Sequence, residues 1–190
     1  LMMAAVVPYS RAADESTIVF GYLEITNDPR YEEKRAYARI RVKPHDRPVP
    51  GAELAIRSSR IIGRALKMKF RLDRREGQTA ADLVSIIDQL LAEGVRYFLV
   101  DAHTEILSDL ARATIGRELL LFNISEPSNT LRAEACQANL MHTLPSYAMQ
   151  TDALAQFLVA NKWHDVLVLK GPLKEDTAFA LSFGTSAKRF

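Results

Sequence analysis

Short apolar runs alternate with amphipathic stretches along the chain. Residues 17–25 (Thr-Ile-Val-Phe-Gly-Tyr-Leu-Glu-Ile) are apolar with almost no polar alternation, which is typical of a central strand covered on both faces. Residues 67–73 alternate basic and apolar side chains, and this period of two predicts a strand with one solvated face near a sheet edge. Further strands are predicted over 96–101, 118–122, 140–144 and 165–170.

Stretches with helical periodicity lie between these predicted strands. The stretch 79–94 begins at a threonine cap, carries an apolar stripe and ends at Gly94. The stretch 51–66 places its apolar residues, Leu54 and Ile61 among them, on one face, which predicts a helix that packs inward through that face. Three more helices are predicted from Thr104, over 146–161 and from Leu173 onward.

The order of these elements is β-α-β-α-β-α-β, followed by a longer connection and β-α-β-α. Such alternation predicts an α/β fold, with a parallel sheet, helices on both faces and right-handed crossovers. We expect the strand over 17–25 to be internal. Residues 26–50 contain four prolines and many charges, which predicts a long loop, and a loop of this length in a compact domain is usually functional.

Composition narrows the function classes only slightly. Hydrophobic residues make up 48% of the 190 residues, which excludes disorder as the main state, and no apolar run is long enough to span a membrane. The single cysteine, Cys136, excludes an internal disulfide, and its apolar helical context predicts a buried structural thiol. The histidines lack metal-ligand spacing, so no metal site is predicted. A net charge of +2 without aromatic interleaving argues against nucleic acid as a partner.

The amino-terminal residues 1–13 are predicted to be the remnant of a signal peptide. Residues 1–8 are largely apolar, and Ser10 and Ala12 occupy the small-residue positions of a cleavage site after Ala12. This prediction implies that the mature protein is exported.

Motifs of several enzyme classes are missing. No G-x-G-x-x-G follows the first strand, and neither a P-loop nor a G-x-S-x-G elbow occurs. Ligands of parallel sheets bind at the carboxyl ends of the strands. The polar group Asp101-Ala102-His103-Thr104 stands at such an end, where the backbone N–H groups of a helix start can hold an anion and His103 could act as an acid or base.

Several segments of the chain resemble type I periplasmic solute-binding proteins of ABC importers. The order of elements from Ile18 onward is similar, and the segment from His142 (His-Thr-Leu-Pro-Ser-Tyr) resembles the start of that fold's second lobe. Residues 28–39 (Asp-Pro-Arg-Tyr-Glu-Glu-Lys-Arg-Ala-Tyr-Ala-Arg) resemble the branch associated with PQQ-dependent alcohol dehydrogenase systems. The resemblance implies a first α/β lobe over 17–141 and the incomplete start of a second α/β lobe over 142–190.

This resemblance implies a receptor in the periplasm that is not an enzyme and has no required cofactor. It would close on a small-molecule solute and deliver it to the membrane subunits of the importer. The branch implies PQQ itself as a bound ligand and a quinoprotein dehydrogenase system as a partner. The alternatives are a small alcohol, an organic acid or an amino acid as the ligand, and an enzyme or regulator of flavodoxin-like build as a different function class.

The predicted ligand contacts follow from the chemistry of PQQ, which is flat and carries three carboxylates. Such a ligand needs guanidinium groups, aromatic rings and backbone N–H groups. We expect Arg30 or Arg35 to pair with a carboxylate of the solute. The predicted ligand-binding residues are Glu24, Arg30, Tyr31, Arg35, Asp101, His103, Thr104, Asn123, Ser125 and Lys170.

Overall fold

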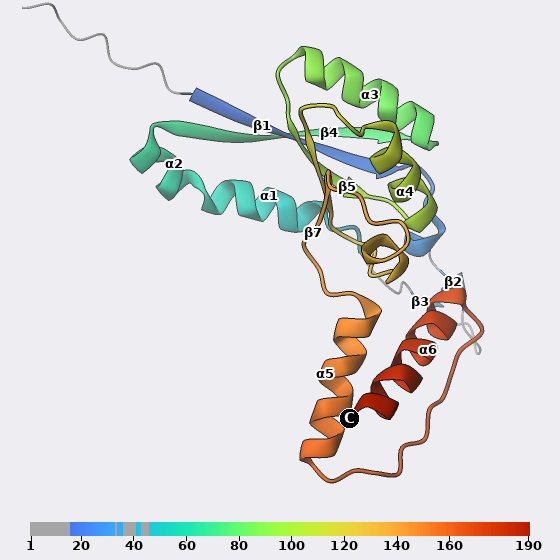
Figure 1. The fold of residues 1–190 in the computed structure, drawn as a ribbon. Helices are drawn as coiled ribbons and strands as arrows, with labels where there is room; N and C mark the ends of the chain where they lie inside the picture. The colour runs from blue at the N-terminus through green and yellow to red at the C-terminus, as the bar shows by residue number, and fades with distance from the viewer. Residues whose placement is uncertain (1–15, 33, 36–40, 43–45) are drawn as a thin grey trace, which may run out of the picture.

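A five-stranded parallel sheet organises the chain (Figure 1). The computed structural model describes residues 16–32, 34–35, 41–42 and 46–190, so the predicted signal-peptide remnant over 1–13 lies outside the described residues. The strands are β1 (Ser16–Ile25), β4 (Met68–Gly77), β5 (Tyr97–Asp101), β6 (Leu120–Asn123) and β7 (Leu140–His142). Their order is β4-β1-β5-β6-β7, with every pairing parallel. The predicted fold class and the internal position of β1 are confirmed.

Helices lie between most of these strands, and two more follow the last strand. They are α1 (Val49–Ser58), α2 (Arg60–Leu66), α3 (Ala80–Ala92), α4 (Thr104–Ala113), α5 (Tyr147–Ala160) and α6 (Lys174–Arg189). Short 3₁₀ turns form over Pro29–Tyr31 and Thr130–Arg132. Within the long segment predicted as a loop, β2 (Lys34–Arg35) and β3 (Arg41–Val42) form a small antiparallel sheet. Among the described residues, no helix combines the length and the hydropathy that crossing a bilayer requires.

The hydrophobic core lies between the sheet and the helices α3 and α4. Buried leucines and isoleucines of the two helices pack against Phe98 and Val100 of β5 and against Leu23 of β1. The approach of β5 to β1 is close, since a Cβ atom added at Gly21 would lie 2.6 Å from Cδ1 of Phe98. Glycine at this position therefore allows the Phe98 ring to lie against the backbone of the central strand.

The predicted helix over 51–66 differs from the structure in two ways. It is broken at Ser59 into α1 and α2, and its apolar face is exposed, with 56% of Leu54 and 79% of Ile61 accessible to solvent. The pair lies along the edge strand β4 on the side away from α3 (Figure 1), and Gly63 alone is buried in α2. The helical period identified a common face correctly, but the core does not extend beneath that face. Cys136, predicted to be buried, is also exposed.

The strand predicted over 165–170 is wrong. Residues 163–170 lie outside both sheets, and Leu167 and Leu169 are 84% and 86% exposed. A strand needs a hydrogen-bonded neighbour, and no strand of the described residues lies beside this segment. The segment joins α5 to α6, which pack against each other and contact through Thr151 Oγ1 and Ser186 Oγ, 2.9 Å apart. The division into lobes over 17–141 and 142–190 stays a prediction.

Candidate ligand-binding site

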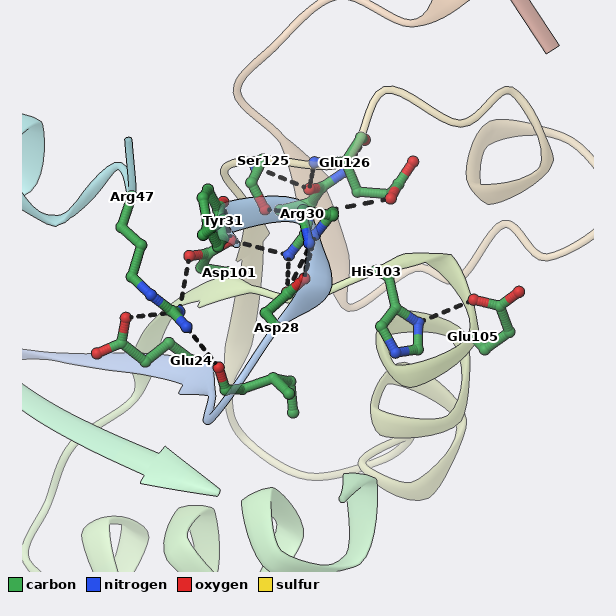
Figure 2. Close-up of polar contacts among 12 residues, drawn as sticks. Glu24, Asp28, Arg30, Tyr31, Arg47, Asp101, His103, Glu105, Ser125 and Glu126 are labelled. Carbon is green, nitrogen blue, oxygen red and sulfur yellow. Dashed lines mark hydrogen bonds and ion pairs between the residues drawn. The ribbon is translucent and has the colours of Figure 1, made fainter. Parts of the chain in front are cut away.

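The polar residues predicted from the strand ends meet at one edge of the sheet. Register pairs Glu24 of β1 with Asp101 of β5, and Val100 of β5 with Asn123 of β6. Because the strands are parallel, the segments that follow them begin at the same edge. Figure 2 shows the side chains gathered there, with Arg30 at their centre.

Arg30 holds this edge together through its guanidinium group. Its Nη2 donates to Asp28 Oδ2 at 2.6 Å and to Asp101 Oδ1 at 3.0 Å, and its Nη1 donates to Ser125 Oγ at 3.1 Å. The Nε also donates to both carboxylate oxygens of Asp28, at 3.1 and 3.0 Å. Asp28 and Asp101 are buried. The donors of Arg30 are therefore engaged by the protein's own acceptors, and a ligand carboxylate would have to compete with these buried carboxylates.

A second arginine, Arg47, contacts several residues on the other side of this edge. It stacks over the Tyr31 ring, with its Cζ 4.7 Å from the ring centroid, while Tyr31 Oη donates to Asp101 Oδ1 at 2.6 Å. Arg47 Nη1 donates to Glu24 Oε2 at 2.9 Å, and Nη2 donates to the carbonyl of Ile25 at 2.8 Å. Arg47 was not predicted as a site residue, although it lies in the charged segment 26–50.

Arg74 is a further residue that sequence reasoning missed. Its Nε donates to the Oε1 of Glu24, so this buried carboxylate lies between two arginines. Arg74 belongs to β4, and register places it beside Tyr22 of β1. The alternation over 67–73 gave no signal for Arg74, because the predicted strand ends at residue 73 and position 74 continues its apolar face rather than its basic one.

Burial and pairing shift the pKa values of several groups in this cluster. Burial raises the pKa of Tyr31 well above its usual range, and the hydrogen bond to Asp101 adds to the shift. Burial also raises the pKa of Glu126, partly offset by the charge of Arg30. For Asp28, burial alone would raise the pKa, but the hydrogen bonds from Arg30 outweigh it and the pKa is lowered. The cluster thus favours an ionised Asp28 and a protonated Tyr31 phenol at neutral pH.

Two buried polar atoms at this edge, Asp101 Oδ2 and Tyr22 Oη, have no hydrogen-bond partner among the residues that the structure describes. Asp101 Oδ2 still lies 3.5 Å from Arg47 Nη1, which compensates its charge. Burial raises the pKa of Tyr22 far above its usual range, with the charges of Asp101 and Glu24 contributing. Both atoms lie among the side chains of this polar cluster.

The lowered pKa of Asp28 predicts how stability depends on pH. Stabilisation from a carboxylate with a depressed pKa is complete above the unfolded value, near 3.8, and is lost as the pH falls through the lower folded value. We expect the free energy of unfolding, measured by urea titration between pH 3 and 7, to fall in the acid range. Asp28→Asn should flatten part of this fall, whereas Asp109→Asn, at an exposed ion pair, should not. Equal acid slopes in the two variants would contradict this assignment.

His103 and Thr104 begin α4 beside the cluster. His103 is the N-cap residue, but its side chain does not cap the helix, and its Nδ1 lies 2.8 Å from Glu105 Oε2. Burial raises the pKa of the Glu126 carboxyl group, and a hydrogen bond with the Thr104 side chain acts in the opposite direction. The N–H groups of the first helical turn thus lack a capping side chain from His103.

The remaining predicted residues occupy three different settings. Asn123 is fully buried and shapes the loop after β6, where its Oδ1 accepts from the N–H of Glu126 at 2.9 Å and its Nδ2 donates to the carbonyl of Glu126 at 2.7 Å. Lys170 lies at a different cleft, formed by α5, α6 and residues 166–171. Arg35 belongs to β2, and its side chain lies outside the described part of the chain. No group of three or more metal-ligating side chains is found among the described residues.

Comparison with known proteins gives structural neighbours only. No family model matches the chain, and no curated protein matches it. An ABC transporter substrate-binding protein from Desulfitobacterium hafniense is similar over 92% of this chain and 48% of its own, with a TM-score of 0.64 and 17% identity. A branched-chain amino acid ABC transporter periplasmic ligand-binding protein from Burkholderia xenovorans LB400 is similar over 90% and 43%, with a TM-score of 0.65 and 14% identity.

A third solved structure, an ABC transporter solute-binding protein from R. palustris in complex with 4-hydroxybenzoate, has a TM-score of 0.60 and 11% identity. The similarity covers 92% of this chain and 44% of that protein. At these identities the likeness establishes the fold, an α/β lobe shared with periplasmic binding proteins. The chain spans about half the length of the solved structures it matches.

Proposed function

We propose that the chain is the solute-binding part of an ABC uptake system that works in the periplasm and binds its solute without catalysis. The observation that carries this proposal is the similarity of fold over about nine-tenths of the chain to solved substrate-binding proteins. A polar cluster stands at the sheet edge where parallel α/β folds bind ligands. Its partners would be the membrane subunits of the importer.

The charge balance of the cluster bears on the ligand. Arg30 and Arg47 are engaged by the buried carboxylates of Asp28, Asp101 and Glu24. PQQ carries three carboxylates, so binding it here would require arginines that already have partners. A solute with one carboxylate needs fewer positively charged partners, because neutral hydrogen-bond donors suffice to bind it. We therefore favour an amino acid or a small aromatic acid over PQQ, and with it the alternative ligand class that the sequence left open.

Neutral donors are available beside the cluster. The Ser125 hydroxyl accepts from Arg30 and makes a side-chain hydrogen bond with Tyr31, so its O–H would exchange Tyr31 for a bound solute. The first turn of α4 offers N–H groups that the His103 side chain leaves uncapped, apart from that of Glu105, which is hydrogen-bonded to the Glu105 carboxylate. The 4-hydroxybenzoate bound by the R. palustris protein and the amino acid class of the B. xenovorans transporter are solutes of this size and charge. The link to a quinoprotein dehydrogenase rests on the resemblance of residues 28–39 alone.

A calorimetric titration of the full chain with leucine, 4-hydroxybenzoate and PQQ tests the proposal. We expect one of the two monocarboxylates to bind more tightly than PQQ. Ser125→Ala should weaken that binding about 10-fold, the effect of one hydrogen bond to a charged group. Ser128→Ala, in the same loop, is the matched control and should bind like the parent. Tightest binding of PQQ would restore the quinoprotein assignment, and turnover of any of these compounds would replace the receptor by an enzyme.

A further inference from the structure

A second cleft lies at the opposite end of the strands from the polar edge. It has a volume of about 630 Å³, within the range of small-molecule sites. Its lining residues come mainly from α1, α2 and the beginning of β4. These elements lie along the edge of the sheet (Figure 1). The lining residues include Ile56 of α1, Arg60 and Arg64 of α2, and Met68 and Phe70 of β4.

Basic side chains predominate in this cleft. Among its described lining residues, four are basic (Arg60, Arg64, Lys69 and Arg71) and none is acidic. Both acidic residues of β4 are already paired with other arginines, Asp73 with Arg75 and Glu76 with Arg74. Among the described residues, no ion pair joins Arg60 to a carboxylate, and the same holds for Arg64 and Arg71. An anion in the cleft would therefore meet guanidinium groups whose charge this part of the chain leaves uncompensated.

The walls of the cleft also have an apolar component. Ile56 of α1 lines it together with Met68 and Phe70 of β4, and Phe70 contacts the Phe20 ring, with centroids 6.5 Å apart. A small hydrophilic anion would leave this surface in contact with water. We propose that the cleft binds an organic anion with an apolar body, whose charged group pairs with Arg60 and Arg64 while the apolar part covers Ile56, Met68 and Phe70.

This site is independent of the proposed solute site. Thr17, which lines the cleft, and Glu24, at the polar edge, lie about 23 Å apart along β1 at about 3.3 Å per residue. The two sites share no lining residue. Loss of binding at one can therefore be measured while the other stays intact.

The test uses the full chain and the fluorescent anion 1-anilinonaphthalene-8-sulfonate. We expect saturable binding that weakens with added salt and is displaced by laurate but not by the uncharged detergent dodecyl maltoside. The double variant R60Q/R64Q should bind the probe about 10-fold more weakly, with an unchanged thermal midpoint of unfolding. R57Q is the matched control, because Arg57 is exposed on α1 but does not line the cleft.

Equal affinity of R60Q/R64Q and the parent would overturn the proposal, and so would an equal loss in R57Q. Displacement of the probe by dodecyl maltoside would overturn it as well, since an apolar surface alone would then explain the binding. Co-sedimentation with phosphatidylglycerol vesicles but not with phosphatidylcholine vesicles would assign the anion to a lipid surface. Displacement by laurate without vesicle binding would assign it to a soluble amphiphile. Both of these results would support the proposal, because each ligand combines a charged group with an apolar part.

Discussion

Arg30→Ala is expected to lower the free energy of unfolding by about 3–5 kcal/mol, the effect of removing one partner from a buried ion pair. Arg30 donates to the buried carboxylates of Asp28 and Asp101, and without it both charges would remain at the sheet edge with fewer donors (Figure 2). Arg47 does not replace it at Asp28, because the donors of Arg47 are engaged by Glu24 and by the carbonyl of Ile25. Urea unfolding at pH 7 measures the change.

The matched control for this prediction is Arg112→Ala. Arg112 pairs with Asp109 on the exposed face of α4, where an ion pair contributes at most about 1 kcal/mol. Arg30→Lys keeps the positive charge but loses the planar guanidinium group with its several donors, so it should recover only part of the stability. If Arg30→Ala unfolds like the parent and instead loses solute binding, then Arg30 is a ligand contact, as the sequence predicted, rather than a brace of the edge.

Gly21→Val is expected to lower the free energy of unfolding by about 2–3 kcal/mol. Already the Cβ atom would lie 2.6 Å from Cδ1 of Phe98 and 3.4 Å from Cδ1 of Leu90. Both neighbours are buried in the main core, so the ring can move only if its surroundings repack. Thermal and urea unfolding of the variant give the loss.

A double-mutant cycle tests the cause of that loss. Phe98→Leu removes the ring atoms that approach Gly21, so the two changes together should cost less than their sum, by about 1–2 kcal/mol. Gly51→Ala is the control, because nothing lies within 4 Å of the added Cβ and the position is helical. Strict additivity of Gly21→Val and Phe98→Leu would show that the ring contact is not the source of the destabilisation.

The sheet could be predicted from the sequence because each strand is a local pattern with clear limits. The apolar run over 17–25 indicated a central strand, and β1 indeed lies between β4 and β5. The segment 165–170 has the same kind of apolar pattern but no strand beside it, and its pattern cannot report whether a neighbour exists. Likewise, the period of α1 and α2 groups Leu54 and Ile61 on one face, but the sequence does not say that the core ends before reaching it.

The position of the candidate site could be predicted from the sequence, but only some of its hydrogen bonds and ion pairs could. Parallel topology brings Arg30, Tyr31, Asp101 and Ser125 together, as expected from the strand ends. Which acceptor each donor contacts depends on distances across the sheet, as between Arg30 and Asp101, which are 71 positions apart. The pairing with Asp28 is local and had a sequence signal, because Asp28 precedes Pro29 and caps the short turn that carries Arg30.

The central position of β1 has a consequence for the order of events during synthesis. Its neighbours β4 and β5 follow it by about 50 and about 80 residues, so both pairings close long loops, which slows folding. At about 5–20 residues per second, a ribosome completes β5 about 4–15 s after β1. Of the described internal strands, the one made first therefore waits longest for its second neighbour, and its apolar run must be kept from nonspecific association until β5 pairs with it.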